Sequence, residues 1–260
     1  IYIFGSHDRF SGKGFCLNDY VSYSASVDNL VDWRYEGVIY RKEQDLENQK
    51  LLKAGKRRLH AFWAPDVVCG ENGRYYLYYC MDNLNKIGVA VCESPAGKYQ
   101  FLGYVRHGDG SVLGEKAGDP MQFDPGIFID SDGTVYLYSG NQDTSELSRK
   151  ISRRQGMNRM SQVMTLEKDM VTLKTEPREL IPSVFNSKGT GFEGHEFFEA
   201  SSIRKFGGKY YFVYSSVNSH ELCYAVSDHT DGGYRYGGTL VDIGDIYLNG
   251  RKPEKSLNAY

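Results

Sequence analysis

The sequence has no excess of positive charge, no long apolar run and no regular pattern of cysteines. The formal net charge of the 260-residue chain is −2, whereas a protein that binds nucleic acid needs a basic face. No stretch approaches the roughly 20 apolar residues of a membrane-spanning helix. The 5 cysteines are odd in number and lack metal-ligand spacing, so they indicate neither a disulfide framework nor a metal site. Composition therefore argues against nucleic acid as a partner and against a membrane span.

Helical periodicity is also nearly absent, since only residues 44–52 suggest a turn or two of helix. The chain is instead rich in aromatic residues, with 21 tyrosines and 13 phenylalanines, which favour strands. One aromatic phrase occurs four times, starting at Tyr2, Tyr76, Tyr136 and Tyr211, at intervals of 74, 60 and 75 residues. A repeat of this length, made of strands and tight turns, predicts a β-propeller.

Turn signals divide each repeat into strands. Gly73, Gly133 and Gly208 stand three residues before the last three copies of the phrase, and Asn-Gly or Asp-Gly turns between strands are strong hairpin signals. Predicted strands cover residues 1–5, 20–26 and 38–40 in the first repeat; 61–69, 74–81, 86–92 and 99–104 in the second; 125–129, 134–139, 161–166 and a stretch near 173 in the third; and 198–204, 209–215 and 221–227 in the fourth. The predicted fold is all-β, a propeller of four-stranded antiparallel blades.

The two ends of the chain do not complete this pattern. Residues 240–260 hold no further copy of the phrase, and the first repeat lacks a strand before its aromatic one. We therefore expect residues 1–260 to be one propeller domain that is truncated at both ends, without the first strand of its first blade and without a fifth blade. Such an excerpt exposes apolar faces and an open sheet edge, which favour aggregation.

Two acids share one position in the repeat. Asp124 and Glu199 each stand nine residues before the turn glycine of their own repeat. Because equivalent positions in a propeller converge on its axis, we expect the two carboxyl groups to lie together at one end of the central channel.

Several segments, taken in order, resemble the blade motifs of glycoside hydrolase family 43. The resemblance rests on residues 26–33 for the first blade, 63–66, 75–78 and 94–97 for the second, 123–133 for the third, and 198–205 with 208–211 for the fourth. It implies a five-bladed propeller and an inverting glycosidase that acts on arabinose- or xylose-containing polysaccharides or oligosaccharides. An inverting enzyme pairs a protonated acid with an ionised base about 6.5–9.5 Å away.

The resemblance also assigns roles to residues. Glu199 matches the general acid of the family, and Asp124 matches the aspartate that modulates the pKa of the acid. The base aspartate of the family falls at a position about ten residues before Ile1, by the same blade phase. The predicted chemistry requires no cofactor, although the resemblance allows a calcium ion on the propeller axis.

Six further residues are candidates for contacting the sugar. Trp63 and Phe62 could stack on a sugar ring or pack between blades, and Asp66 could bind the sugar or pair with a neighbouring blade. The others are His7 and Asp8, near the channel mouth, and His195, in the loop before Glu199. No histidine pair has metal-ligand spacing on a shared element, so no metal site is predicted.

The leading hypothesis is an exo-acting α-L-arabinofuranosidase or β-xylosidase. Residues 41–58, 142–160 and 183–195 form segments long enough to wall a pocket, and the basic stretch 149–159 is predicted to be a solvated loop. The alternative is a carbohydrate-binding propeller without hydrolytic activity, which becomes the better hypothesis if the position of the base holds no carboxylate.

Overall fold

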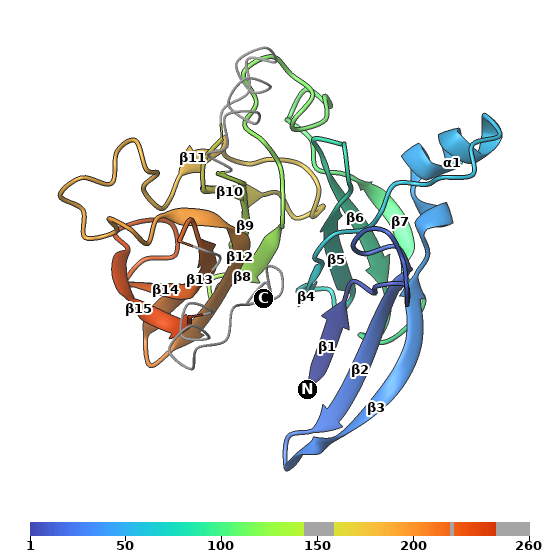
Figure 1. Cartoon of the computed structure of the whole chain (residues 1–260), viewed down its shortest axis with the longest axis horizontal. Helices are drawn as coiled ribbons and strands as arrows, with labels where there is room; N and C mark the ends of the chain where they lie inside the picture. Colours follow the sequence, from blue (N-terminus) through green and yellow to red (C-terminus); the bar gives the residue numbers. More distant parts are fainter. Residues whose placement is uncertain (143–158, 219–220, 243–260) are drawn as a thin grey trace.

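The strands form four antiparallel sheets, arranged as the blades of a propeller (Figure 1). The computed structural model describes residues 1–142, 159–218 and 221–242. The first two blades are β1 (Tyr2–Gly5), β2 (Tyr20–Ser26) and β3 (Asn29–Tyr40), then β4 (Asp66–Cys69), β5 (Tyr75–Cys80), β6 (Ile87–Cys92) and β7 (Gln100–Tyr104). The last two are β8 (Gly126–Ile129), β9 (Val135–Ser139), β10 (Gln162–Leu166) and β11 (Arg178–Glu179), then β12 (Phe197–Phe206), β13 (Lys209–Ser216), β14 (Leu222–Ser227) and β15 (Arg235–Val241). The predicted all-β propeller is confirmed.

The first strands of the last three blades, β4, β8 and β12, lie toward the centre of the propeller. Strand β8 contacts both β4 and β12, so these three strands lie next to one another across blade boundaries. The residues that precede or begin them are therefore brought to the same end of the channel.

In its last three copies the aromatic phrase has no polar alternation, because both faces of its strand are largely buried. Side chains along a strand point alternately to opposite faces. Tyr76 and Tyr78 of β5 join an apolar cluster with the third blade, and Leu77 and Tyr79 join one with the first blade. A third apolar cluster, around Phe212, joins the last two blades. Each boundary between consecutive blades is thus filled by one apolar cluster.

Three elements differ from the prediction. Strand β3 begins at Asn29 rather than near residue 38, because a tight turn pairs Ser26 with Asn29 and continues the hairpin along exposed residues. The last strand of the third blade is β11, while Leu173 forms only an isolated bridge to Leu166. Strand β15 was not predicted, since its sequence has two glycines and little alternation.

The predicted helical turn is the helix α1 (Leu46–Lys53), preceded by a short 3-10 helix (Lys42–Gln44). Asp45 caps α1 by accepting the backbone N–H groups of Glu47 and Asn48. The hydroxyls of Tyr79 and Tyr104 also donate to its buried carboxylate, at 2.6 and 2.9 Å. This segment is tied to the second blade and stands away from the propeller axis. Within the described residues, no helix is long and apolar enough to cross a membrane.

The first blade leaves apolar side chains in contact with solvent. Ile3 of β1 is 49% exposed, and Val31 of β3 is 91% exposed. The expected exposure of apolar faces is therefore present, and such faces favour association.

Candidate active site

Asp124 and Glu199 are held by unusual backbone conformations. Asp124, just before β8, has φ 42°, and Ala200, directly after Glu199, has φ 64°. Non-glycine residues rarely adopt positive φ, and such strain concentrates at functional sites. The pairing of β12 with β13 shifts register between Glu199 and Ser202, and a bulge of this kind re-aims side chains.

The two carboxyl groups lie close together. Both residues are nearly buried, with 4% of Asp124 and 7% of Glu199 exposed. Burial and then the charge of Glu199 raise the pKa of Asp124 well above its usual value, although the backbone N–H of Ala200 donates to this carboxylate. The thiol of Cys80 lies 3.9 Å from Asp124 Oδ1. The two acids therefore meet at one end of the channel, as their shared position in the repeat predicts.

A chain of hydrogen bonds orients Glu199. Asn141 Nδ2 donates to Glu199 Oε2 at 2.8 Å, and Arg159 Nη1 donates to Asn141 Oδ1 at 2.6 Å. Sequence reasoning missed both residues. A signal for Asn141 was available, because the second repeat has the apolar Met81 at the same position after its aromatic phrase. Arg159 belongs to the stretch predicted to be a solvated loop and is instead engaged with the site; residues 149–158 lie outside the described residues.

Asp66 joins two blades. Its Oδ2 accepts the backbone N–H of Ile127, the second residue of β8, at 2.9 Å. Burial raises its pKa, an effect that this hydrogen bond and the charge of Arg204 oppose. This contact corresponds to the pairing between blades that the sequence left open.

The two neighbouring aromatic residues have different surroundings. Phe62 is fully buried and stacks on Tyr20 and Tyr40, with ring centroids 4.7 and 5.4 Å apart. The prediction that Phe62 stacks on a sugar is therefore wrong, because the ring already packs between blades. Trp63 contacts Phe123, next to Asp124, at 5.6 Å. Its buried indole N–H has no hydrogen-bond partner among the described residues, which is uncommon for a buried polar group.

Truncation of Phe62 should destabilise the fold. We expect Phe62→Ala to lower the free energy of unfolding by about 3–5 kcal/mol, because it leaves a cavity among stacked rings. The measurement is urea unfolding followed by circular dichroism. Phe10→Ala is the matched control, since Phe10 is 98% exposed and surface changes usually stay within about 0.5 kcal/mol. Similar losses in both variants would contradict the assignment.

The loop between β1 and β2 carries His7 and Asp8. Both are exposed, and Asp8 Oδ1 accepts the backbone N–H of Cys16 at 2.6 Å. Burial raises the pKa of the Cys16 thiol, and the charges of Asp8 and Asp124 raise it further. The loop therefore lies near Asp124 and brings Cys16 there, a residue that the sequence did not single out.

His195 contacts Glu221 and Tyr236. Its Nδ1 lies 2.5 Å from Oε1 of Glu221, and its ring stacks on Tyr236 with centroids 4.4 Å apart. It is not among the residues that line the cavity on the propeller axis, where Asp66 and Asp124 lie.

The axial cavity has a volume of about 410 Å³ and is lined by residues of all four blades, including Phe4, Asp66, Asp124 and Ser201. Calcium takes six to eight oxygen ligands. Among the described residues of this cavity, Asp66 already accepts backbone N–H groups and Arg204 adds positive charge. These residues do not form a calcium cage, so no chemical step is assigned to calcium.

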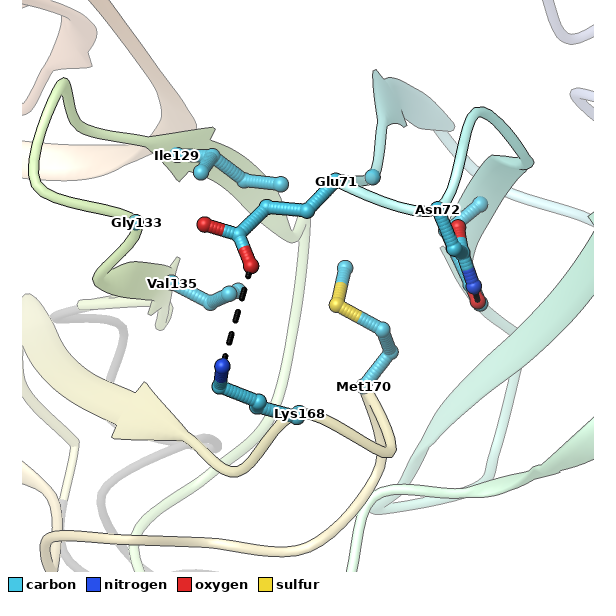
Figure 2. A pocket seen from close by; sticks show the side chains of 9 residues that line it. Glu71, Asn72, Ile129, Gly133, Val135, Lys168 and Met170 are labelled. Atoms are coloured by element: carbon cyan, nitrogen blue, oxygen red, sulfur yellow. Dashed lines mark hydrogen bonds and ion pairs between the residues drawn. The ribbon is translucent and has the colours of Figure 1, made fainter.

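A smaller pocket lies at the other end of the inner strands, between the turns of the second and third blades. It has a volume of about 140 Å³, and Figure 2 shows its apolar side chains Ile129, Val135 and Met170. Glu71 and Lys168 approach to 3.9 Å across it. Both side chains are largely exposed, and ion pairs of this kind contribute little to stability.

Comparisons with known proteins agree with the propeller fold. A family model described as glycosyl hydrolases family 43 matches residues 2–234. The chain is 52% identical to a xylosidase/arabinosidase from Thermoclostridium stercorarium, over 100% of this chain and 51% of that relative. It is 30% identical to a xylosidase/arabinosidase from Bacteroides ovatus, over 93% of this chain and 74% of that relative. A solved α-L-arabinofuranosidase from Clostridium thermocellum is similar with a TM-score of 0.64 and 27% identity, over 94% of this chain and 70% of that one. The chain thus spans about half the length of the first relative.

Proposed function

The chain belongs to glycoside hydrolase family 43, and we propose that it acts as an inverting, exo-acting glycosidase that removes arabinose or xylose units from plant polysaccharides or oligosaccharides. The observation that carries the proposal is the buried pair of Asp124 and Glu199, whose charges interact. When two carboxyl groups lie this close, ionising both of them is unfavourable. One of them therefore retains its proton near neutral pH. Similarity to xylosidase/arabinosidases supports the sugar class.

In this proposal Glu199 is the general acid. It donates a proton to the glycosidic oxygen as the bond to the anomeric carbon breaks, and a water attacks the opposite face of the sugar. Asp124 keeps the proton on the pair through its negative charge. The repeat positions point to no described residue as the base that activates the water. Chemical roles are therefore given to Glu199 and Asp124 alone.

Trp63 is proposed to contact the sugar beside the acid pair. Its ring lies against Phe123, and its indole N–H has no partner among the residues the structure describes. The ring would pack on the apolar face of the sugar.

The test uses the full-length protein and 4-nitrophenyl β-D-xyloside and α-L-arabinofuranoside. We expect nitrophenol release from at least one of them, and proton NMR should show the inverted anomer as the first sugar product. Binding of xylo- or arabino-oligosaccharides by calorimetry without hydrolysis would instead establish a non-hydrolytic propeller.

Loss of Asn141 should impair catalysis more than binding. Asn141→Ala removes a hydrogen bond to a carboxyl group, worth about 1.5–3 kcal/mol when charged, so we expect kcat to fall roughly 10- to 100-fold with KM little changed. The basic limb of the pH–rate profile, where the general acid loses its proton, should also shift, which a purely structural role would not cause. Asn72→Ala is the matched control, because Asn72 donates to Tyr76 at the other end of the blade. A rise in KM at constant kcat would contradict the positioning role.

A further inference from the structure

Three side chains with different donor atoms converge at the edge of the last blade. They are His195, from the loop before β12, and Glu221 and Cys223, at the start of β14. One donor atom of each, a nitrogen, an oxygen and a sulfur, lies within 4.8 Å of the other two. The sequence predicted no metal site, because these residues are far apart along the chain and on different elements.

The structure holds each of the three side chains in place. Glu221 and Cys223 are two residues apart and so point to the same face of the strand. The backbone of His195 is fixed on both sides, since its N–H donates to the carbonyl of Phe192 at 2.8 Å and its carbonyl accepts the Tyr214 hydroxyl at 2.6 Å. Its ring lies nearly parallel to that of Tyr236, at 12°.

Hydroxyl groups surround the cluster as outer partners. Ser216 Oγ donates to Glu221 Oε1 at 2.9 Å, and Thr239 Oγ1 donates to Oε2 at 3.2 Å. Thr239 Oγ1 also lies 3.7 Å from Cys223 Sγ. Partners of this kind orient metal ligands and tune their basicity.

We propose that His195, Glu221 and Cys223 bind a divalent transition-metal ion of the zinc class. Imidazole, carboxylate and thiolate are the donors that zinc takes, whereas calcium and magnesium take oxygen alone. Metal bonds of about 2.0–2.3 Å place neighbouring donors roughly 3.5 Å apart. The observed separations, from 2.5 Å up to 4.8 Å, bracket this value, so small side-chain rotations suffice.

Binding exchanges protons for the ion. The ion binds Nδ1 of a neutral His195 ring whose proton is then carried on Nε2, and the Cys223 thiol releases its proton to the solvent; nothing is oxidised or reduced. The side chain of His195 is 33% exposed whereas that of Glu221 is 3% exposed, so the ion enters from the His195 side. Three protein ligands leave a fourth position for water. The site clamps the loop before β12 onto β14 and β15 and does not depend on the proposed hydrolysis.

The experiment titrates the metal-stripped protein with cobalt(II), which reports zinc-type sites by its absorption spectrum. We expect one equivalent to bind, with a thiolate-to-cobalt charge-transfer band that zinc(II) then abolishes. Cys223→Ser should lose this band, whereas Cys69→Ser should keep it, because Cys69 is an exposed free cysteine outside the cluster. His195→Gln should weaken cobalt binding at least about tenfold.

Three results would overturn the proposal. They are the absence of a charge-transfer band in the unaltered protein, an undiminished band in Cys223→Ser, and unaltered cobalt affinity in His195→Gln. Circular dichroism checks that each variant folds. If Cys223→Ser does not fold, the titration of His195→Gln decides, because this side chain is partly exposed and its replacement leaves the core intact.

Discussion

Glu199→Gln is expected to abolish acid assistance while keeping the fold. Glutamine has the size of glutamate and can still accept the hydrogen bond from Asn141, but it has no acidic proton to donate. General acid catalysis contributes typically about 10²–10⁴-fold. We therefore expect kcat on natural xylo- or arabino-oligosaccharides to fall by about this factor.

The choice of leaving group separates catalysis from binding. Glycosides of acidic phenols need little protonation when the bond breaks, so Glu199→Gln should retain most of its activity on them. Glu193→Gln is the matched control, since Glu193 is exposed and accepts backbone N–H groups of its own loop. Equal losses on both substrate types would indicate a binding or structural role for Glu199.

Asp124→Asn is expected to reduce activity and at the same time stabilise the protein. Asparagine tolerates the positive φ of this position better than most residues, so the backbone should be retained. Activity should fall at least about tenfold, because the proton on Glu199 loses the charge that holds it there. The free energy of unfolding at pH 7 should rise by about 1 kcal/mol or more, because asparagine does not carry the cost of ionising a buried carboxyl group beside Glu199.

The raised pKa of Asp124 also determines how the stability of the protein should change with pH. The pKa of Asp124 is raised in the folded state, compared with about 3.9 in an unfolded chain. Its contribution to stability is therefore fully present below about pH 4 and is lost as the pH rises through the folded-state pKa. Urea unfolding between pH 4 and 8 should show this decline in the unaltered protein and a flatter curve in Asp124→Asn.

Asp130 provides a control of opposite sign. Its pKa is lowered to about 2, because hydrogen bonds from Lys205 and Tyr210 outweigh its burial. Its contribution is present above about pH 4 and is lost as the pH falls toward 2. Asp130→Asn should thus leave the slope between pH 4 and 8 unaltered. The same slope change in both variants would refute the assignment of the effect to Asp124.

Tertiary structure corrected the role of Phe62, one of the residues that the sequence singled out. Phe62 and Trp63 are adjacent and both aromatic, yet one is enclosed by Tyr20 and Tyr40 and the other reaches Phe123 beside the acid pair. Which face of a strand meets another blade depends on the approach of distant segments, and local patterns do not record it.

The sequence by itself determined the blade architecture and the meeting of Asp124 with Glu199. Turn glycines, strand patterns and the repeat phase are local or periodic properties, and they place equivalent residues at equivalent depths around one axis. Only the tertiary structure decided the partners of these acids, such as Asn141 with Arg159, and the meeting of His195 with Glu221 and Cys223. These contacts join residues that share neither a strand nor a repeat position, because they form where loops cross between elements that are distant along the chain.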